Sequence, residues 1–416
     1  MNNEKSLDVA RVRSEFPGLE NGWTFFDNAG GTQILRGAVE RLNEFLLHRN
    51  VQTGGTYAVS RAAAQSLAEG REAMRLFVNA RRAEEIVFAP SSTVALQNLA
   101  RSLQSRFRPG DEIVVTRLDH ESNIGPWTAL EAAGVVLRFW DVDPESCRYD
   151  LEVLDALMNE RTKLVAVSQV SNIVGVVNPI ADIAALVHER GALLCVDSVA
   201  CAPHRALDVQ ALDVDFLVYS LYKVYGPHYA VMYGKYDLLA ELDGLYHYFY
   251  GRDKVPAKLE PGNASYELAY SSTAIVDYLV RLGSELGADD RKDDARRCLL
   301  AAFDAITDHE CRLGERLLAW LRSRSDCRVV GPVDGSDTDR IPIVSFRVDG
   351  RHSGELAERI DAYNIAVRFG DFHARRLIEY LGVADRGGVL RVSMVHYNSL
   401  DEVDALIDAF ERVFAA

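Results

Sequence analysis

Short apolar runs alternate with longer amphipathic segments through the middle of this 416-residue chain. Five of the runs are rich in β-branched and aromatic residues and have the length of buried strands. They occupy residues 112–116, 135–139, 164–168, 193–196 and 216–219. Between two of them, residues 180–190 have apolar side chains at helical spacing, and Gly191 follows as a normal C-terminal cap. This alternation predicts an α/β fold with a mainly parallel central sheet that helices cover on both faces.

The pattern changes near residue 289. The sequence from there predicts a long, charged amphipathic helix over residues 291–323, a strand at 344–346 and a final helix over 401–414. We interpret residues 289–416 as a smaller α+β domain that follows a large domain of residues 21–288. We expect the N-terminal segment, residues 1–20, to pack against the smaller domain.

The composition limits the partners and the compartment. Hydrophobic residues make up 48% and charged residues 26% of the chain, as in an ordinary globular protein. The formal net charge of −15 argues against nucleic acid or an anionic membrane as a partner, because both favour a basic surface. We find neither a signal-peptide core nor an apolar run of the ~18 residues that a transmembrane helix needs. The six cysteines show no metal-binding spacing, so we expect reduced thiols, no metal site and a cytoplasmic protein.

Two of the predicted strands end at residues that can carry chemistry. The strand at 216–219 leads into Ser220, Lys223 and a Gly-Pro turn, and the strand at 193–196 leads into Asp197. Ligands of parallel sheets bind at the carboxyl ends of the strands. Burial there lowers the pKa of a lysine and favours a Schiff base, and a carboxylate can pair with a pyridinium nitrogen. Together these are the minimal apparatus of a pyridoxal-phosphate (PLP) enzyme, although each motif alone also fits a surface lysine and a helix-capping aspartate.

Further motifs accompany this lysine and aspartate in a fixed order along almost the whole chain. They are FDNAGGT at 26–32, SSTVALQN at 91–98, DHESNIGPW at 119–127, VSNIVG at 170–175, VRFG at 367–370 and RVS at 391–393. In sequence and spacing they resemble the class V aminotransferase group of fold-type I PLP enzymes. The resemblance is greatest to the cysteine desulfurase and selenocysteine lyase branch, in particular to its members that lack the catalytic cysteine. It implies the fold of that group, PLP as cofactor, an amino acid substrate and a homodimer with shared active sites.

The resemblance assigns three catalytic residues and a set of cofactor ligands. Lys223 would hold PLP as a Schiff base and then move the proton at the substrate Cα, while Asp197 would pair with the ring nitrogen. His120 would stack on the ring. The other cofactor-binding residues implied are Ser92, Thr93, Ser220 and Tyr222 near the phosphate, Asn172 near the ring, and Tyr266, whose loop crosses to the phosphate of the partner subunit. A helix that begins at the serines suits a phosphate, although an ordinary serine cap explains them equally well.

The resemblance also implies substrate-binding residues. Arg391 lies at the position that binds the substrate carboxylate, where a planar guanidinium can bind bidentately. Arg368 is a second candidate for contact with the carboxylate or the side chain. Asn172 and His373 complete the predicted substrate site.

The chain departs from the desulfurase pattern at three positions. His373 occupies the position of the persulfide-forming cysteine, and an imidazole cannot accept sulfur as a persulfide. Ala200 replaces a glutamine that hydrogen-bonds the phenolic oxygen of the cofactor. We expect the loss of this hydrogen bond to change the reaction specificity. Tyr222 replaces the histidine that precedes the lysine, and its phenol can still reach a phosphate.

These features predict a PLP enzyme that removes the proton from Cα of an L-amino acid. The favoured reaction is carbon–sulfur β-elimination from a cysteine derivative, because a thiolate can leave Cβ without an enzyme cysteine. Epimerisation, transamination, and oxidative deamination or decarboxylation share the same first steps and stay open as alternatives. A catalytically silent PLP-binding scaffold is the alternative of another class, and the intact Lys223, Asp197 and Arg391 argue against it.

Overall fold

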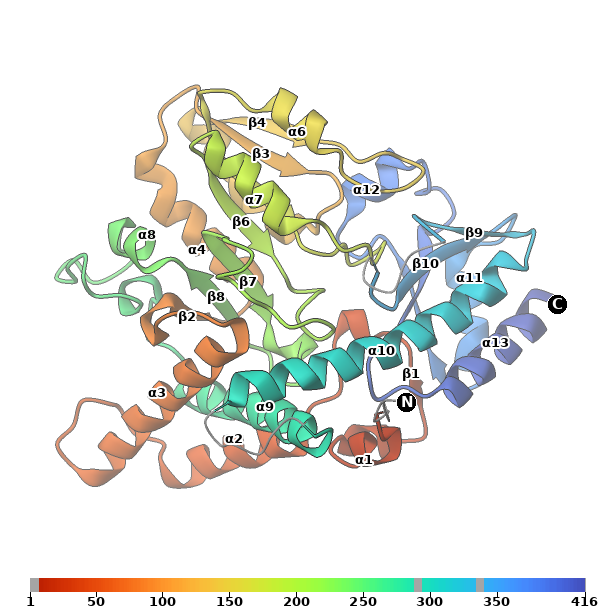
Figure 1. Cartoon of the computed structure of the whole chain (residues 1–416), viewed down its shortest axis with the longest axis horizontal. Coiled ribbons are helices and arrows are strands. Elements are labelled where there is room, and N and C mark those ends of the chain that lie inside the picture. The colour runs from red at the N-terminus through yellow and green to blue at the C-terminus, as the bar shows by residue number, and fades with distance from the viewer. Residues whose placement is uncertain (1–6, 288–293, 334–339, 416) are drawn as a thin grey trace.

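The computed structural model describes residues 7–287, 294–333 and 340–415. Its centre is a seven-stranded sheet with the strand order β2-β8-β7-β6-β5-β3-β4 (Figure 1). Only β8 runs against its neighbours, so the sheet is mainly parallel, as the alternation of strands and helices predicts. The strands are β2 (Ile86–Ala89), β3 (Glu112–Thr116), β4 (Val136–Trp140), β5 (Thr162–Ser168), β6 (Leu193–Asp197), β7 (Phe216–Ser220) and β8 (Ala230–Gly234).

Alternate residues of the central strands enter two different cores. In β5, Val165 and Val167 belong to one apolar cluster, whereas Leu164 and Ala166 belong to another. Helix α7 (Ile180–Glu189) contributes to the first cluster, and α4 (Ser92–Leu103) contributes to the second. Because side chains alternate across a strand, the two clusters lie on opposite faces of the sheet. Both faces are therefore covered, which explains why these strands are apolar throughout.

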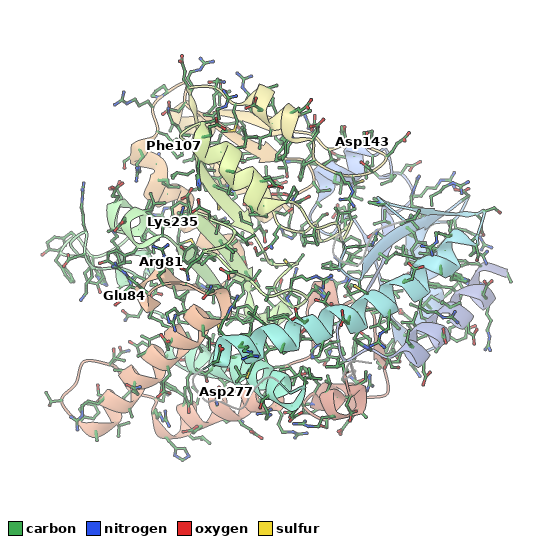
Figure 2. All side chains as sticks on the ribbon, viewed as in Figure 1. Arg81, Glu84, Phe107, Asp143, Lys235 and Asp277 are labelled. Carbon is green, nitrogen blue, oxygen red and sulfur yellow. The ribbon has the colours of Figure 1, made fainter. Side chains whose placement is uncertain are left out.

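Three long helices pack together on the first of these two cores. They are α2 (Arg36–His48), α3 (Ala58–Val78) and α9 (Tyr266–Glu285), with α9 in contact with both of the others. Gly70 of α3 allows the close approach, since a Cβ there would lie 2.4 Å from the carbonyl oxygen of Ala269. Short helices complete this part of the chain: α1 (Val9–Arg13), α5 (Gly125–Thr128), α6 (Leu151–Leu157) and α8 (Tyr236–Glu241). Charged side chains such as Glu84 and Asp143 project from the surface (Figure 2).

The C-terminal part has an antiparallel sheet with the strand order β12-β13-β10-β9. Its strands are β9 (Cys327–Val329), β10 (Ile343–Val348), β12 (Arg368–Gly370) and β13 (Val389–Ser393), and its helices are α11 (Ser353–Asp361), α12 (Arg375–Tyr380) and α13 (Leu400–Ala415). Helix α10 (Ala295–Arg322) crosses the molecule from α9 to α13 (Figure 1). Its first half packs in the large core and its second half in a separate C-terminal core. The predicted domain boundary, between residues 288 and 289, lies outside the described residues and stays a prediction.

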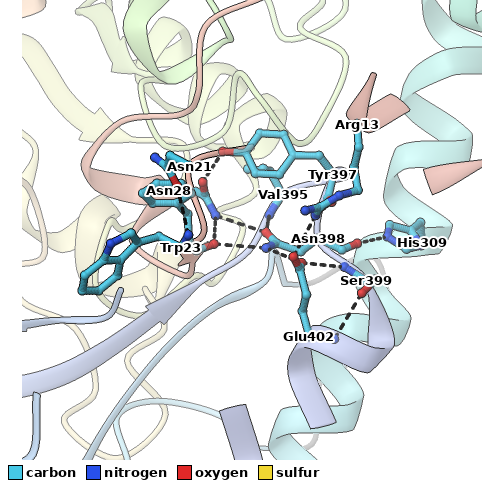
Figure 3. A network of polar contacts seen from close by, with 11 residues as sticks. Arg13, Asn21, Trp23, Asn28, His309, Val395, Tyr397, Asn398, Ser399 and Glu402 are labelled. Carbon is cyan, nitrogen blue, oxygen red and sulfur yellow. Dashed lines mark hydrogen bonds and ion pairs between the residues drawn. The ribbon is translucent and has the colours of Figure 1, made fainter. Parts of the chain in front are cut away.

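A polar network joins the N-terminal segment to the C-terminal part (Figure 3). Arg13 donates to the carbonyl oxygen of Tyr397 at 2.9 Å and to Glu402 at 2.8 Å. Asn28 donates to the side chain of Asn398 at 3.1 Å. Next to this network, β1 (Thr24–Phe25) pairs in parallel with β11 (Ile365–Ala366). These contacts fix the residues around position 27 against the end of β13, which matters for the site described next.

No helix in the described ranges is long and apolar enough to cross a membrane.

Candidate active site

A cavity opens where the parallel strands β5, β6 and β7 end, at Ser168, Asp197 and Ser220. Its volume is about 580 Å³ when the open mouth is included. Loops and the start of α4 supply the rest of the lining. The lining residues are Ser91, Ser92, Thr93, His120, Ser122, Ser168, Val170, Asn172, Asp197, Val199, Ala200, Ser220, Tyr222 and Lys223. Eight residues that the sequence predicts as cofactor ligands are therefore brought together, because strand ends meet at one edge of the sheet.

Lys223 and Asp197 are buried ionisable side chains that line the cavity. Lys223 ends a short 3-10 helix after β7, and the residue is only 8% exposed. Burial, followed by the positive charge of Arg391, lowers the pKa of Lys223 to about 8. Burial raises the pKa of Asp197 above its ordinary value, while the amide of Val199 donates to its carboxylate at 2.8 Å. A neutral lysine is a nucleophile and a base, so the lowered pKa makes this amine reactive near neutral pH.

The start of α4 forms an anion-binding end of the cavity. The hydroxyls of Ser92 and Ser220 hydrogen-bond to each other, and Thr93 hydrogen-bonds to Ser122 at 2.7 Å. Ser91 caps the helix by accepting from the amide of Val94 at 3.2 Å. The first amides of a helix have no partner within it and carry the positive end of the helix dipole. Hydroxyls and amides at this point can together bind a phosphate.

His120 lies between the cavity and the loop after β12. Burial, followed by the charge of Lys223, lowers the pKa of His120 to about 3, so its imidazole is neutral at physiological pH. Its Nδ1 accepts from the amide of Ser122 at 3.1 Å. The ring of His373 lies 5.2 Å away, centroid to centroid, at an angle of 50°. His373 is exposed and has a left-handed backbone conformation (φ 58°), so the loop turns sharply to bring it beside His120.

Arg391 lies on β13, deeply buried next to the cavity, with 2% of its side chain exposed. One terminal nitrogen donates to the carbonyl oxygen of Asn172 at 3.1 Å and the other to Asp27 at 3.0 Å. The Nε of Arg391 and the Oδ1 of Asn172 are buried without a hydrogen-bond partner in the part of the chain that the structure describes. Arg368 lies opposite Arg391 on β12 and pairs with Asp27 at 2.9 Å. Buried polar atoms without partners indicate a place for a polar ligand.

Sequence reasoning left Asp27 and Phe372 without a role. Asp27 contacts both arginines, and Phe372 lies under the guanidinium of Arg391 with its carbonyl accepting from Asn172 at 3.0 Å. Asp27 is part of the FDNAGGT motif, which is the one signal in the sequence that could have singled it out.

With this geometry in view, the comparisons with known proteins identify the family. A family model described as Aminotransferase class-V matches residues 24–406. The chain belongs to the class-V aminotransferase family. It is 39% identical over 420 residues to the aminotransferase-like protein FGM3 of Gibberella zeae, covering 99% of this chain and 100% of that protein. It is 32% identical to the cysteine desulfurase-like protein ustD of Aspergillus flavus, covering 99% of this chain and 91% of that one.

Comparison with solved structures supports the same family. The apo structure of a cysteine desulfurase from Thermococcus onnurineus NA1 has a TM-score of 0.87 and 26% identity, and the match covers 99% of each chain. The predicted fold type and the predicted branch are confirmed. The chain is a class V enzyme of the cysteine desulfurase-like branch, a PLP-dependent group whose members act on amino acids.

One predicted cofactor ligand of this class V enzyme lies outside the cavity. Tyr266 begins α9 and lines a separate hollow with Gln52 and Asn263. Its hydroxyl donates to the side chain of Gln52 at 3.2 Å. Within one chain Tyr266 therefore does not meet the cavity of Lys223. Its role at a phosphate depends on a second copy and stays a prediction.

Proposed function

We propose that this class V enzyme binds PLP and catalyses carbon–sulfur β-elimination from an L-cysteine derivative. One observation carries the proposal. The cavity combines a buried lysine, a buried carboxylate and an adjacent buried arginine, yet no cysteine is among its described lining residues. His373 stands where the desulfurase pattern has its cysteine, and its ring lies beside His120 at the mouth. The site can thus remove a proton from Cα but has no thiol to take up sulfur.

The side chains of the cavity fit PLP in size and chemistry. Lys223 would hold the cofactor covalently, and the carboxylate of Asp197 would pair with its ring nitrogen. Ser92, Thr93 and Ser220, at the start of α4 and the end of β7, would hold the phosphate. PLP, when bound, supplies an electron sink for the charge that develops at Cα. The cavity also suits the ring, because the neutral His120 offers a flat face and Ala200 leaves space.

The residues around the substrate have different roles in the reaction. Arg391 binds the α-carboxylate through nitrogens that are already fixed by Asn172 and Asp27. This anchoring directs the Cα hydrogen toward Lys223, whose lowered pKa leaves a useful fraction of neutral amine to take the proton. The C–S bond then breaks with its electron pair on sulfur, which leaves as a thiolate. Overall, the thioether and one water give a thiol, pyruvate and ammonium.

Product analysis tests this proposal. The holoenzyme is incubated separately with L-cysteine, a thioether derivative of cysteine and simple amino acids, and the products are identified by mass spectrometry. A thiol and pyruvate indicate the lyase. Alanine with a persulfide indicates a desulfurase, and a racemised or transaminated substrate indicates one of the other reactions of the family. The Lys223→Ala variant serves as the control for chemistry that does not need the site.

A further inference from the structure

Arg368 and Arg391 stand directly opposite each other on the paired strands β12 and β13. Like charges at directly opposed positions destabilise a sheet. Arg391 is buried, whereas 56% of the Arg368 side chain is exposed. The pair therefore places two positive charges beside a cavity where one substrate carboxylate is expected, and something must balance the excess.

Asp27 provides that balance by bridging the two arginines. One carboxylate oxygen accepts from Nη2 of Arg391 at 3.0 Å, and the other pairs with Nε of Arg368 at 2.9 Å. The backbone fixes the position of Asp27, because it forms a bridge with Ser393 of β13. Residue 30 has to be small for this arrangement, since a Cβ on Gly30 would lie 2.9 Å from an Asp27 carboxylate oxygen. The contact is thus built into the chain and is not a chance surface pair.

Asp27, Arg368 and Arg391 form a triad whose net charge leaves one positive unit for the ligand. Two guanidinium groups and one carboxylate sum to a single positive charge. The Nε of Arg391, buried and without a partner among the described residues, remains to be satisfied. The triad is also electrostatically connected to the cavity, because Asp27 raises the pKa of Lys223 while both arginines lower it.

We propose that Asp27 is a positioning and specificity residue that restricts this site to one substrate carboxylate. It acts through Arg391, which it orients for the α-carboxylate, and through Arg368, which it withholds from a second acidic group. Amino acids with uncharged side chains are thereby favoured over those with acidic side chains. This inference rests on the proposed function, because it takes Arg391 as the anchor of an amino acid substrate.

Binding of simple carboxylates tests the inference without any turnover. Propionate has one carboxylate and succinate has two, so the ratio of their dissociation constants measures how many anionic groups the site accepts. Both are titrated calorimetrically into the holoenzyme and into Asp27→Asn in a low-chloride buffer. We expect the substitution to shift the ratio toward succinate by about tenfold, which equals about 1.4 kcal/mol. An unchanged ratio in a folded Asp27→Asn variant would overturn the inference.

Arg368→Gln provides an independent test if Asp27→Asn does not fold. With Arg368 removed, Asp27 neutralises Arg391 alone, so propionate should bind at least about fivefold more weakly, a change of about 1 kcal/mol. Arg375→Gln, an exposed arginine on the nearby α12, is the matched control and should leave propionate binding unchanged. Equal propionate affinity in Arg368→Gln and the parent enzyme contradicts the inference. Because these measurements are binding constants, they can contradict the inference even if the lyase reaction is observed. Equally, the predicted changes in binding can be found even if the enzyme is not a lyase.

Discussion

Arg391 lies over the ring of Phe372, with its guanidinium carbon 3.8 Å from the ring centroid. A guanidinium stacked on an aromatic face gains a cation–π attraction and keeps its edge free for hydrogen bonds. Here two of those edge nitrogens donate to Asn172 and Asp27. Burial lowers the pKa of Arg391 to about 10, so the group stays charged at physiological pH. A charged guanidinium that is fixed in orientation and largely shielded from water is suited to bind a carboxylate ligand.

Replacement of Arg391 by lysine should distinguish the contribution of its positive charge to substrate binding from that of its planar geometry. Arg391→Lys keeps the positive charge but loses the planar fork and the stacking on Phe372. We expect kcat/KM for the amino acid substrate to fall by at least about tenfold, since each charged hydrogen bond contributes about 1.5–3 kcal/mol. The visible absorbance of the bound cofactor should be unchanged. A kinetically normal lysine variant contradicts the assignment and leaves Arg368 as the next candidate, with Arg375→Lys as the control.

The reactivity of Lys223 should depend on pH in a defined direction. Burial and the charge of Arg391 lower its pKa from 10.5 to about 8. The neutral amine is the reactive form, so the rate at which the apo-protein forms a borohydride-reducible bond with PLP should rise with pH. We expect the midpoint near 8 rather than near the ordinary value. Peptide mapping should find the label on Lys223, and Lys223→Ala should abolish it. A label on another lysine contradicts the site assignment.

The cysteines should be dispensable for turnover. Cys195 and Cys201 are buried, and burial raises the pKa of both thiols, which makes them poor nucleophiles. Replacing all six cysteines should leave turnover within a few-fold, with a loss of stability on the order of 1 kcal/mol for each buried thiol. Mass spectrometry of the enzyme during turnover should detect no persulfide. A persulfide on any cysteine, with activity lost on its replacement, would restore the desulfurase interpretation.

Tyr266 should act across a dimer interface. The chain on either side of Asn50 and Gln52, which line its hollow, exposes apolar side chains, among them Leu47 at 75% and Tyr57 at 53%. We expect sedimentation to show a homodimer. Tyr266→Phe should weaken cofactor binding by at least about tenfold, because a hydrogen bond to a charged group contributes about 1.5–3 kcal/mol. Tyr270→Phe, on the same helix, is the control. A fully active monomer at working concentration contradicts the shared site.

The local pattern of the chain was sufficient to predict the strands that carry the site. Residues 112–116 form β3 as expected, and the predicted strand at 216–219 is β7, one residue longer. The reason is that both are short, continuously buried runs with β-branched or aromatic side chains. The antiparallel direction of β8 could not be predicted in this way, because a buried strand has the same composition in either direction.

The contacts that complete the site depend on distant parts of the chain. Asp27 and Arg391 are 364 residues apart, and only the pairing of the N-terminal segment with the C-terminal part brings them together. The approach of His120 and His373 depends likewise on the left-handed turn at Phe372 and His373. No periodicity or motif spacing contains that information, whereas Ser220 and Lys223 are neighbours in sequence and were found from it.

The fate of the three-carbon skeleton of an S-alkyl-L-cysteine decides whether this enzyme catalyses β-elimination. The holoenzyme without its six cysteines is incubated with S-methyl-L-cysteine, and methanethiol, pyruvate and alanine are quantified together. β-Elimination predicts methanethiol and pyruvate in equal amounts, with no alanine and no turnover by Lys223→Ala. Alanine as the main three-carbon product, or an amino acid recovered only in racemised form, would contradict β-elimination as the reaction of this enzyme.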